Sequence, residues 1–416
     1  MRPVRLLKTA AVVTSFAVAA AAFSGCGSWV NRIKYMFAPE PTLSENSDSL
    51  SKVPTGERAQ AENAYCYQSL DSDELRELYL TIGEQLGKTY SEEFSVGNTT
   101  LSVFDEALLA YEMDHPEVFW LNLSSRYKYV DYGGSLDIEL NFELEGDELN
   151  AAKETFNQKI EEAVAQAPSD ATDYQMEIFV NNYIIDNCEY QSEASMRHNA
   201  YGALVNGAAV CDGYSKAFQI LCGKLGIDCV GVNGLSPEFN QENDESADNG
   251  HMWNCVKIGG EWYHIDVTWN DGDAHIQRYL YFNLTTKEIQ KNHLISPLYG
   301  ENPDAELHNI FVPECSATEY NYLKRECVTL YDLDNDSELL AAFLQAVRNE
   351  EPYFDFLISD ELDYNETTNA ISDSYGYYWI DTVNSYNSGG LQISEDTRFY
   401  TYNTVNAVTF DLNYIY

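Results

Sequence analysis

One short stretch of the chain decides the fold of its central part. Residues 250–269 read GHMWNCVKIGGEWYHIDVTW, in which two runs rich in β-branched and aromatic residues flank Gly259-Gly260. Two such runs joined by paired glycines predict a β-hairpin with a two-residue turn. In that register His251 and Asp266 lie on one face as diagonal neighbours, within reach of each other's side chains. A turn with an odd number of residues would put them on opposite faces.

A second stretch, residues 198–214, reads HNAYGALVNGAAVCDGY and leads into a predicted helix. From Cys211 onward apolar residues recur at the i, i+3, i+4 spacing of a helix with one buried face, and Gly226 is a suitable stop. Cys211 therefore lies in the first turn, where unpaired backbone N–H groups and the helix dipole favour a thiolate. We also expect Gly207 and Gly213 to let a substrate backbone approach closely.

A thiolate-forming cysteine with a histidine and a carboxylate nearby has the groups that nucleophilic acyl transfer requires. In this scheme His251 takes the proton of Cys211 and later gives it to the leaving amine. Asp266 holds the imidazole in the required tautomer and stabilises its charged form. Backbone N–H groups at the helix start bind the oxyanion of the tetrahedral intermediate. The candidate catalytic residues are therefore Cys211, His251 and Asp266.

These motifs resemble a known family. Three runs, AYGALVNGAAVCDGY (200–214), GHMWN (250–254) and WYHIDVTWND (262–271), are similar to the bacterial branch of the transglutaminase-like superfamily. The resemblance implies a papain-like α+β core and a Cys–His–Asp triad, which fall on the three residues named above. It extends to residues 281–283 and, more weakly, to His293. Met252 stands where the family usually has alanine, and this departure leaves the triad intact.

Three more residues are candidates for the substrate cleft. His198 either lines the cleft near the cysteine or lies in an ordinary surface loop. Tyr201 contributes either to the oxyanion site or to packing. Trp253 is either a substrate platform or part of the hairpin packing. The residues alone leave all three alternatives open.

We expect no metal ion and no cofactor. A metal site formed by His251, His264 and Asp266 is conceivable, but the sequence offers no further close ligand for it. In the predicted hairpin His264 lies opposite Cys255 on the same face, and we expect it to have a structural role. The nine cysteines show no paired metal-binding spacing such as C-x-x-C.

The start of the chain predicts export. Residues 1–25 contain three basic and no acidic residues, and an apolar run of small residues suits the hydrophobic region of a signal peptide. The run ends in Phe23-Ser24-Gly25-Cys26, which resembles a bacterial lipobox with Cys26 as the lipidated residue. Phe23 replaces the usual leucine. The alternative is an ordinary secretory signal with Cys26 incidental. Residues 26–62, rich in serine and proline, predict a flexible tether.

Composition limits the possible partners. The 416 residues carry a net charge of −43, and no basic cluster follows the N-terminus, which excludes nucleic acid as an expected partner. A solvated, mutually repelling surface is the simplest explanation of the excess acid. An apolar content of 44% supports a packed core and excludes wholesale disorder.

Beyond the tether the pattern predicts an α+β protein in three parts. Residues 63–168 form an N-terminal α+β region with helices near 71–87, 102–112 and 147–165 and strands near 126–130 and 136–144. Residues 169–300 form the transglutaminase-like domain, in which the helix bearing the cysteine packs on an antiparallel sheet. Residues 301–416 form a C-terminal α+β module with a helix at 337–348 and strands at 328–331, 353–358, 399–404 and 407–416.

The expected function follows from these parts. We expect a membrane-anchored protein outside the cytoplasm. It transfers acyl groups of peptide or protein amides through a thioester, and its substrates are associated with the cell wall. Hydrolysis (protease, amidase or deamidase) is favoured because water needs no dedicated acceptor site. The alternatives are glutamine cross-linking and a catalytically silent binding or scaffold module of the cell envelope.

Overall fold

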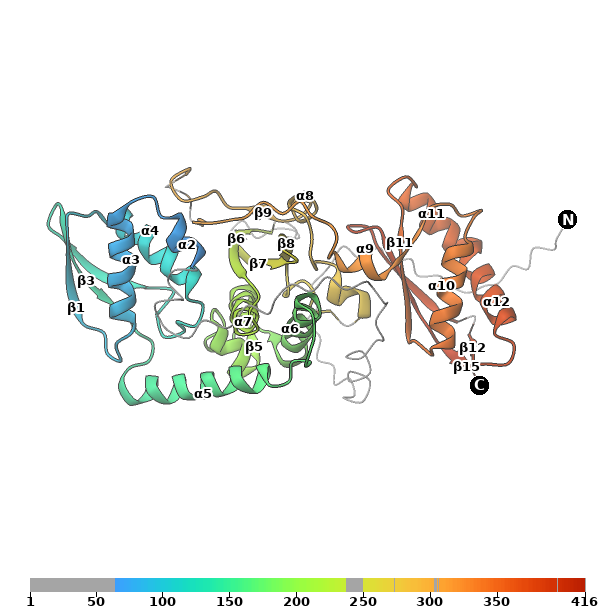
Figure 1. The fold of residues 1–416 in the computed structure, drawn as a ribbon, viewed down its shortest axis with the longest axis horizontal. Coiled ribbons are helices and arrows are strands. Elements are labelled where there is room, and N and C mark those ends of the chain that lie inside the picture. The colour runs from blue at the N-terminus through green and yellow to red at the C-terminus, as the bar shows by residue number, and fades with distance from the viewer. Residues whose placement is uncertain are drawn as a thin grey trace. The chain divides into compact units, whose positions relative to one another are not determined.

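The computed structural model describes residues 64–236, 250–272, 274–302, 305, 307–394 and 396–415. The predicted signal peptide, the tether and Cys26 lie outside these residues. The described chain forms two compact units, which Figure 1 shows. The first contains residues 64–272 and 281–318, and the second contains residues 274–280 and 319–415. No helix among the described residues is long and apolar enough to cross a membrane.

The first unit begins with a small α+β layer. Its elements are α2 (Tyr65–Ser69), α3 (Asp73–Leu86), β1 (Glu93–Gly97), α4 (Leu101–Asp114), β2 (Tyr127–Asp131) and β3 (Ser135–Leu140). The sheet is antiparallel in the order β1-β3-β2. The side chains of Ser72 and Thr100 accept hydrogen bonds from backbone N–H groups and so cap α3 and α4. A buried leucine-rich face of α3 and the inner faces of α4 and β3 share one core.

The last residue of α4 joins this layer together. The carboxylate of Asp114 accepts hydrogen bonds from the backbone N–H of Cys66 at 2.9 Å and of Tyr67 at 2.8 Å. It also accepts one from the hydroxyl of Tyr79, on α3, at 3.1 Å. A negative charge at the start of α2 is favourable because the helix N-terminus is electropositive. One carboxylate therefore connects α2, α3 and α4.

The second layer of the unit carries the motifs. Its helices are α5 (Gly146–Val164), α6 (Asp173–Asn187), the π-helical turn η2 (Gly202–Asn206), α7 (Cys211–Lys224) and α8 (Thr286–Ile289). Its strands are β4 (Glu189–Tyr190), β5 (Ala208–Ala209), β6 (Cys229–Leu235), β7 (Gly250–Ile258), β8 (Glu261–Ile265) and β9 (Leu294–Ile295). The main sheet is antiparallel in the order β8-β7-β6-β9, and α7 packs on β6 and β7. Figure 1 shows α7 beside these strands, with α6 next to it.

The predicted hairpin is confirmed. Strands β7 and β8 pair antiparallel, with Ile258 opposite Glu261 and Cys255 opposite His264. The two-residue turn is Gly259-Gly260, with φ of +61° and +91°. Positive φ at both turn positions is the conformation that paired glycines allow without strain. The register therefore follows from the turn.

The second unit has its own core around a mixed sheet. Its helical elements are η4 (His275–Tyr279), α9 (Tyr322–Glu326), α10 (Ser337–Arg348), α11 (Tyr364–Ala370), η5 (Ile371–Tyr375) and α12 (Gly376–Tyr386). Its strands are β10 (Val328–Leu330), β11 (Tyr353–Ile358), β12 (Gln392–Ile393), β13 (Arg398–Tyr402), β14 (Ala407–Asp411) and β15 (Tyr414–Ile415). The larger sheet has the order β10-β11-β14-β13, and its buried faces share a core with α10 and α12.

A short excursion of the chain belongs to this second unit. Residues 274–280 leave the first unit and pack with the second. His275 Nδ1 lies 2.9 Å from Asp355 Oδ2, on β11. The ring of Tyr279 stacks on Tyr322 with centroids 3.7 Å apart. The second unit is thus assembled from two separate stretches of sequence.

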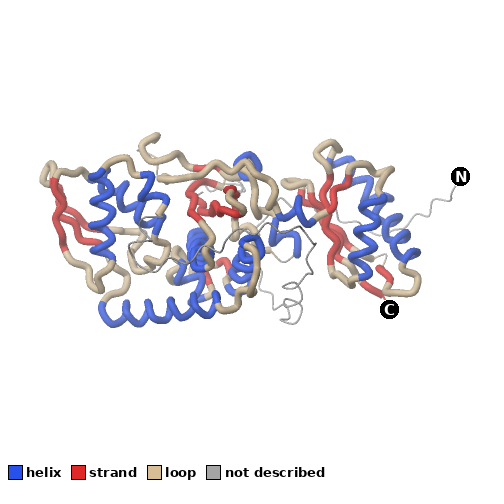
Figure 2. The backbone as a smooth tube through the Cα atoms, in the orientation of Figure 1, coloured by secondary structure: helices blue, strands red, loops and turns tan. Residues whose placement is uncertain are grey.

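The α+β class is confirmed, with helices against each sheet (Figure 2). Every helix and strand predicted from periodicity is present within a few residues. The predictions did not include β1, α6 or α12. In α6 the buried face contains the polar residues Glu177 and Asn181, which obscure its helical period. The predicted domain boundaries remain predictions. In the structure residues 301–318 group with the first unit, and the second unit resumes at residue 319.

Candidate active site

Cys211 is the first residue of α7, and its side chain is partly exposed. The short parallel pair β4–β5 leads the chain into it. At this helix position the backbone N–H has no intrahelical acceptor, so it is available to a substrate oxygen. Gly207, with φ of +68°, ends η2 and turns the chain toward the helix. The predicted placement of the cysteine in the first helical turn is confirmed.

Gly213 has a different role from the one we expected. A Cβ atom at this position would lie 2.5 Å from the carbonyl oxygen of Arg197 and 2.7 Å from the Cβ of Ala209. The close approach that requires glycine is therefore that of the chain's own backbone, which packs against the first turn of α7. The expectation that Gly213 makes room for a substrate backbone is wrong for this reason.

His251 and Asp266 meet across the hairpin as the register predicts. His251 Nε2 lies 2.6 Å from Asp266 Oδ2, and the two side chains are 5% and 0% exposed. The thiol of Cys211 also hydrogen-bonds to the His251 side chain. Because Nε2 is occupied by the carboxylate, Nδ1 is the ring atom left to face the thiol. The structure thus brings Cys211, His251 and Asp266 into one hydrogen-bonded chain.

Burial and charge oppose each other at this pair. Burial disfavours a charged imidazole, but the carboxylate of Asp266 and the thiol of Cys211 outweigh it and raise the pKa of His251 to about 10. Burial likewise acts against the ionised carboxylate, but His251 and His293 outweigh it and hold the pKa of Asp266 well below its usual range. At neutral pH the pair is an imidazolium facing a carboxylate.

A second histidine donates to the same carboxylate. His293 Nε2 lies 2.9 Å from Asp266 Oδ2, and His293 is fully buried. Its Nδ1 contacts the side-chain amide of Asn292 at 2.8 Å, and that amide in turn donates to the hydroxyl of Tyr281. Burial lowers the pKa of His293, with Asp266 opposing the shift. Burial thus favours the neutral imidazole of His293, whose single N–H must lie on Nε2 to donate to the carboxylate and so orient it.

The backbone fixes the other side of Asp266. Its Oδ1 accepts a hydrogen bond from the N–H of Trp269 at 3.1 Å. Its own N–H donates to the carbonyl oxygen of Tyr281 at 3.0 Å. The ring of Trp269 packs on His293, with centroids 4.5 Å apart. With both oxygens engaged, the carboxylate has one orientation.

His198 and Asp212 form a pair next to the thiol. His198 Nδ1 lies 3.0 Å from a carboxylate oxygen of Asp212, the residue that follows Cys211. Burial opposes ionisation of this carboxyl, but the hydrogen bond from His198 and the charge of Lys216 lower the pKa of Asp212. His198 is about half exposed. The expectation that His198 lies near the cysteine therefore agrees with the geometry.

Tyr190 is a neighbour of the site that sequence reasoning missed. It lies on β4 and is 47% exposed. Burial of its hydroxyl end, followed by the charges of Cys211 and Asp212, raises its pKa to about 12. The charge of Cys211 thus acts on this side chain, whose ring centroid lies 6.4 Å from that of Tyr214 on α7. No motif marked it, because a tyrosine after a helix end is common.

The other two cleft candidates are packing residues. Trp253 is 0% exposed and its indole N–H donates to His264 Nδ1 at 3.1 Å, which agrees with the alternative of hairpin packing and not with a substrate platform. The ring of Tyr201 packs against Phe119 and Phe156. Tyr201 also lines a cavity of about 730 Å³ with residues of α5. Neither residue contacts the thiol in the described part of the chain.

Among the residues that the structure describes, two buried clusters contain residue types that bind metals. In the cluster of His251, Asp266 and His293, the nitrogen–oxygen distances of 2.6 and 2.9 Å are hydrogen bonds and leave no room for an ion. In the cluster of Cys255, His264 and Cys315, both ring nitrogens of the histidine already have protein partners. The donor atoms of neither cluster fit a resident ion.

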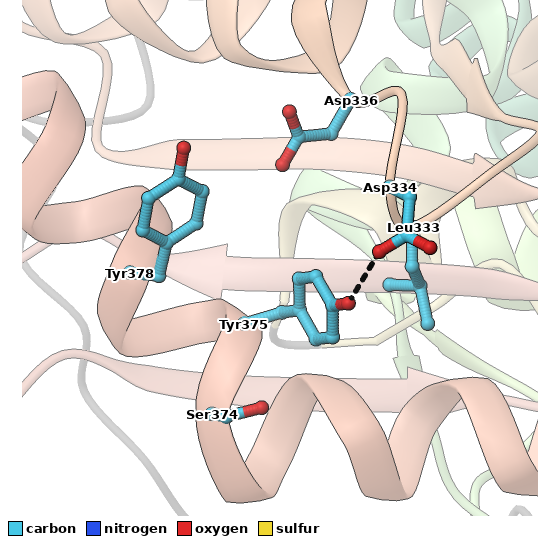
Figure 3. A pocket seen from close by; sticks show the side chains of 6 residues that line it. All are labelled: Leu333, Asp334, Asp336, Ser374, Tyr375 and Tyr378. Atoms are coloured by element: carbon cyan, nitrogen blue, oxygen red, sulfur yellow. Dashed lines mark hydrogen bonds between the residues drawn. The ribbon is translucent and has the colours of Figure 1, made fainter. Parts of the chain in front are cut away.

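A separate pocket lies in the second unit (Figure 3). It has a volume of about 340 Å³ and is lined by Leu333, Asp334, Asp336, Ser374, Tyr375 and Tyr378. The hydroxyl of Tyr375 donates to Asp334 Oδ1 at 3.0 Å. The pocket contains none of the candidate catalytic residues.

The fold and the site define a class: an α+β protein with a cysteine at a helix start and a His–Asp pair on the facing sheet. Residues 159–267 match the model of the transglutaminase-like superfamily. This part of the chain belongs to that superfamily.

Individual proteins match over shorter lengths. The kyphoscoliosis peptidases of Mus musculus and Homo sapiens are 38% and 36% identical over 64 residues, which is 15% of this chain. The match spans 10% of the length of each of these relatives.

Three solved structures are also similar. A candidate cysteine protease from Cytophaga hutchinsonii is matched over 50% of this chain and 70% of its own, with 11% identity and a TM-score of 0.24. A TGase is matched over 53% of this chain and 60% of its own, with 12% identity and a TM-score of 0.25. A candidate protease from Parabacteroides distasonis is matched over 34% of this chain and 35% of its own, with 10% identity and a TM-score of 0.20.

Proposed function

We propose that this protein catalyses cysteine-dependent acyl transfer on peptide or protein amides, with Cys211 as nucleophile. The observation that carries the proposal is the hydrogen-bonded chain from the Cys211 thiol through His251 to the buried Asp266. A nucleophile, a base within hydrogen-bonding reach and a group that orients the base are the parts this chemistry needs. Membership of the superfamily supports the same reading.

The steps follow from the positions of the atoms. At neutral pH the proton shared with the thiol resides on the His251 imidazolium, and Sγ of Cys211 attacks the amide carbonyl carbon. The resulting oxyanion lies near the unpaired N–H groups at the start of α7. The imidazolium, stabilised by Asp266, then protonates the leaving amine as the C–N bond breaks. A thioester on Cys211 remains.

The acceptor of the acyl group decides the reaction class. We propose water, which gives a protease, amidase or deamidase. His251 would deprotonate the water, and Cys211 would leave as its thiol. The partly exposed thiol supports access of water. A primary amine as acceptor would instead give glutamine cross-linking, and a domain that only binds a partner would be catalytically silent.

We also propose that the protein acts outside the cytoplasm. Residues 1–25 as signal peptide and Cys26 as lipidated residue would tether it to the membrane, and its substrates would be peptides or proteins of the cell envelope. Detergent phase partitioning of the wild type and Cys26→Ala tests the anchor. The wild type should enter the detergent phase and the variant should not. Equal partitioning of the wild type and the variant would overturn the proposed lipid anchor and would leave the proposed acyl transfer unaffected.

The chemistry is tested with substrates. Wild type and Cys211→Ala are incubated with cell-wall peptides and with a glutamine-containing protein, with and without a primary amine, and analysed by mass spectrometry. Cleavage or a gain of about one dalton from deamidation, seen only with the wild type, would support hydrolysis. A Cys211-dependent amine adduct would replace that proposal by cross-linking. Equal results for both proteins would favour the binding module.

A further inference from the structure

Two thiols that the proposed reaction does not use meet inside the first unit. Cys255, on β7, and Cys315, near the end of the unit, are 0% and 1% exposed. Their Sγ atoms lie 3.8 Å apart, although the residues are 60 positions apart in sequence. Neither side chain contacts Cys211, His251 or Asp266 in the described residues. The pair therefore calls for its own explanation.

Backbone contacts hold Cys315 in this place. The N–H of Thr286 donates to the carbonyl oxygen of Cys315 at 2.7 Å, and the N–H of Cys315 donates to Thr286 Oγ1 at 3.1 Å. Cys255 is fixed in the same way by its ladder bonds in the centre of β7. Two anchored backbones, rather than mobile side chains, set the short distance between the sulfur atoms.

The neighbouring histidine argues against a metal ion between the thiols. His264 Nδ1 accepts the indole N–H of Trp253 at 3.1 Å and contacts Cys255 Sγ at 3.2 Å. Its Nε2 contacts Thr286 Oγ1 at 3.1 Å. A metal ligated by Nδ1 would have to displace the buried indole. Two thiols without a third free donor suit bond formation between the sulfurs better than metal binding.

We propose that Cys255 and Cys315 form an intramolecular disulfide by thiol–disulfide exchange with an external disulfide such as oxidised glutathione or a dithiol oxidase. The Cys315 thiolate attacks one sulfur of the oxidant and releases its first thiol. The Cys255 thiolate then attacks Cys315 Sγ in the mixed disulfide and releases the second. Each cysteine loses one proton, and the oxidant is reduced to two thiols. This inference goes beyond acyl transfer and does not depend on it.

The order of the two steps follows from the surroundings of the sulfurs. The hydrogen bond with Cys255 lowers the pKa of Cys315 to about 6, against the effect of burial and with help from His264. Burial raises the pKa of Cys255 well above its usual range. Cys315 is thus the first attacking thiolate. The sulfurs must approach by a further ~1.7 Å to reach bonding distance.

The bond would enclose a functionally important loop. Residues 255–315 contain Asp266, its partner His293 and the backbone of Trp269 that fixes its orientation. A crosslink between the ends of this loop reduces the entropy of the unfolded chain and keeps the loop closed on the hairpin. The disulfide would therefore protect the geometry of the carboxylate while leaving all three candidate catalytic residues unmodified.

The test uses the full chain with Cys211→Ala, so that the nucleophile takes no part. One sample is unfolded, reduced and refolded in a glutathione redox buffer containing zinc. A second is purified without unfolding and equilibrated with oxidised glutathione. Both are quenched in acid, denatured, alkylated without reductant and digested. Mass spectrometry should find one crosslinked peptide pair joining Cys255 to Cys315, two hydrogens lighter than the sum of its peptides and lost on reduction.

Variants make the assignment specific. Cys315→Ala should abolish the crosslink and leave Cys255 fully alkylated. Cys66→Ala is the matched control, because Cys66 is equally buried but lies beside Asp114, and this variant should retain the crosslink. Alkylation of both thiols in both samples, a crosslink of either to another cysteine, or retention of one equivalent of zinc in its place would overturn the proposal. Because Cys211 is absent throughout, none of these outcomes bears on acyl transfer.

Discussion

The Nε2–H groups of His251 and His293 both donate hydrogen bonds to Asp266 Oδ2, with nitrogen–oxygen distances of 2.6 and 2.9 Å. The two imidazoles differ in charge although they share this acceptor. Contact with the carboxylate and with Cys211 overcomes burial and makes His251 an imidazolium, whereas burial keeps His293 neutral. Asp266 is therefore positioned by one histidine while it stabilises the charge of the other.

This arrangement predicts the effect of removing His293. In His293→Ala the shared oxygen loses a buried donor, which costs on the order of 1–3 kcal/mol. We expect kcat/KM to fall by roughly ten- to a hundredfold, mostly in kcat, because His251 is less well oriented. Steady-state kinetics on any substrate found for the wild type measure this. A rise in KM with kcat unchanged would contradict an orienting role.

The raised pKa of His251 predicts the pH range of activity. The imidazolium persists until the pH approaches about 10, so kcat/KM should keep its value above neutral pH and decline near that point. In Asp266→Asn the descending limb should move toward the ordinary histidine range, because the charge that stabilises the imidazolium is gone. An alkaline limb at the same pH in both proteins would show that it does not report His251.

The same shift has a consequence for stability. Because the folded-state pKa of His251 is raised, its contribution to folding is fully present below about 6.5, the ordinary value, and is lost as the pH rises through about 10. Urea unfolding at a series of pH values should show this loss in the wild type. His251→Gln should show a smaller loss over the same interval. Parallel curves for the two proteins would refute the assignment.

Thiol chemistry tests the site without a known substrate. Cys211 in the folded protein should react with iodoacetamide at pH 6 at least tenfold faster than in the denatured chain, since its sulfur hydrogen-bonds to the His251 side chain. His251→Ala should lose this advantage. Quantitative mass spectrometry of the Cys211 peptide measures both rates. Equal rates in folded and denatured wild type would remove the activated-nucleophile hypothesis.

Two glycines of α7 offer a matched pair of substitutions. Gly213→Ala would place a methyl group 2.5 Å from the carbonyl oxygen of Arg197, whereas nothing lies within 4 Å of a Cβ at Gly223. We expect Gly213→Ala to destabilise the protein by about 1–3 kcal/mol and to displace the first helical turn with Cys211. Gly223→Ala should be neutral or stabilising by up to ~1 kcal/mol. Thermal unfolding and iodoacetamide rates compare the two.

Much of the site's geometry could be predicted from local sequence. The paired glycines fix the hairpin register, and the register alone brings His251 to Asp266. Helix periodicity likewise places Cys211 at the start of α7. Both predictions rest on interactions between residues close in the chain, for which sequence patterns are most informative.

The rest depends on contacts between distant residues. The pairing of Cys255 with Cys315 arises from chain packing across 60 positions, and no local pattern reports it. Gly213 was misread because its close neighbour, Arg197, belongs to a loop whose path the sequence does not reveal. Trp253 was a cleft candidate because its type suits both a platform and a core, and only its burial distinguishes them.

The excursion of residues 274–280 into the second unit has a consequence for biosynthesis. His275 is translated 80 residues before its partner Asp355. At synthesis rates of about 5–20 residues per second, roughly 4–16 seconds pass between the synthesis of His275 and that of Asp355 on β11. During that interval the side chains of the excursion are open to other contacts. The first unit contains residues on both sides of this loop, so it can fold on the nascent chain while the loop still lacks its partners from the second unit.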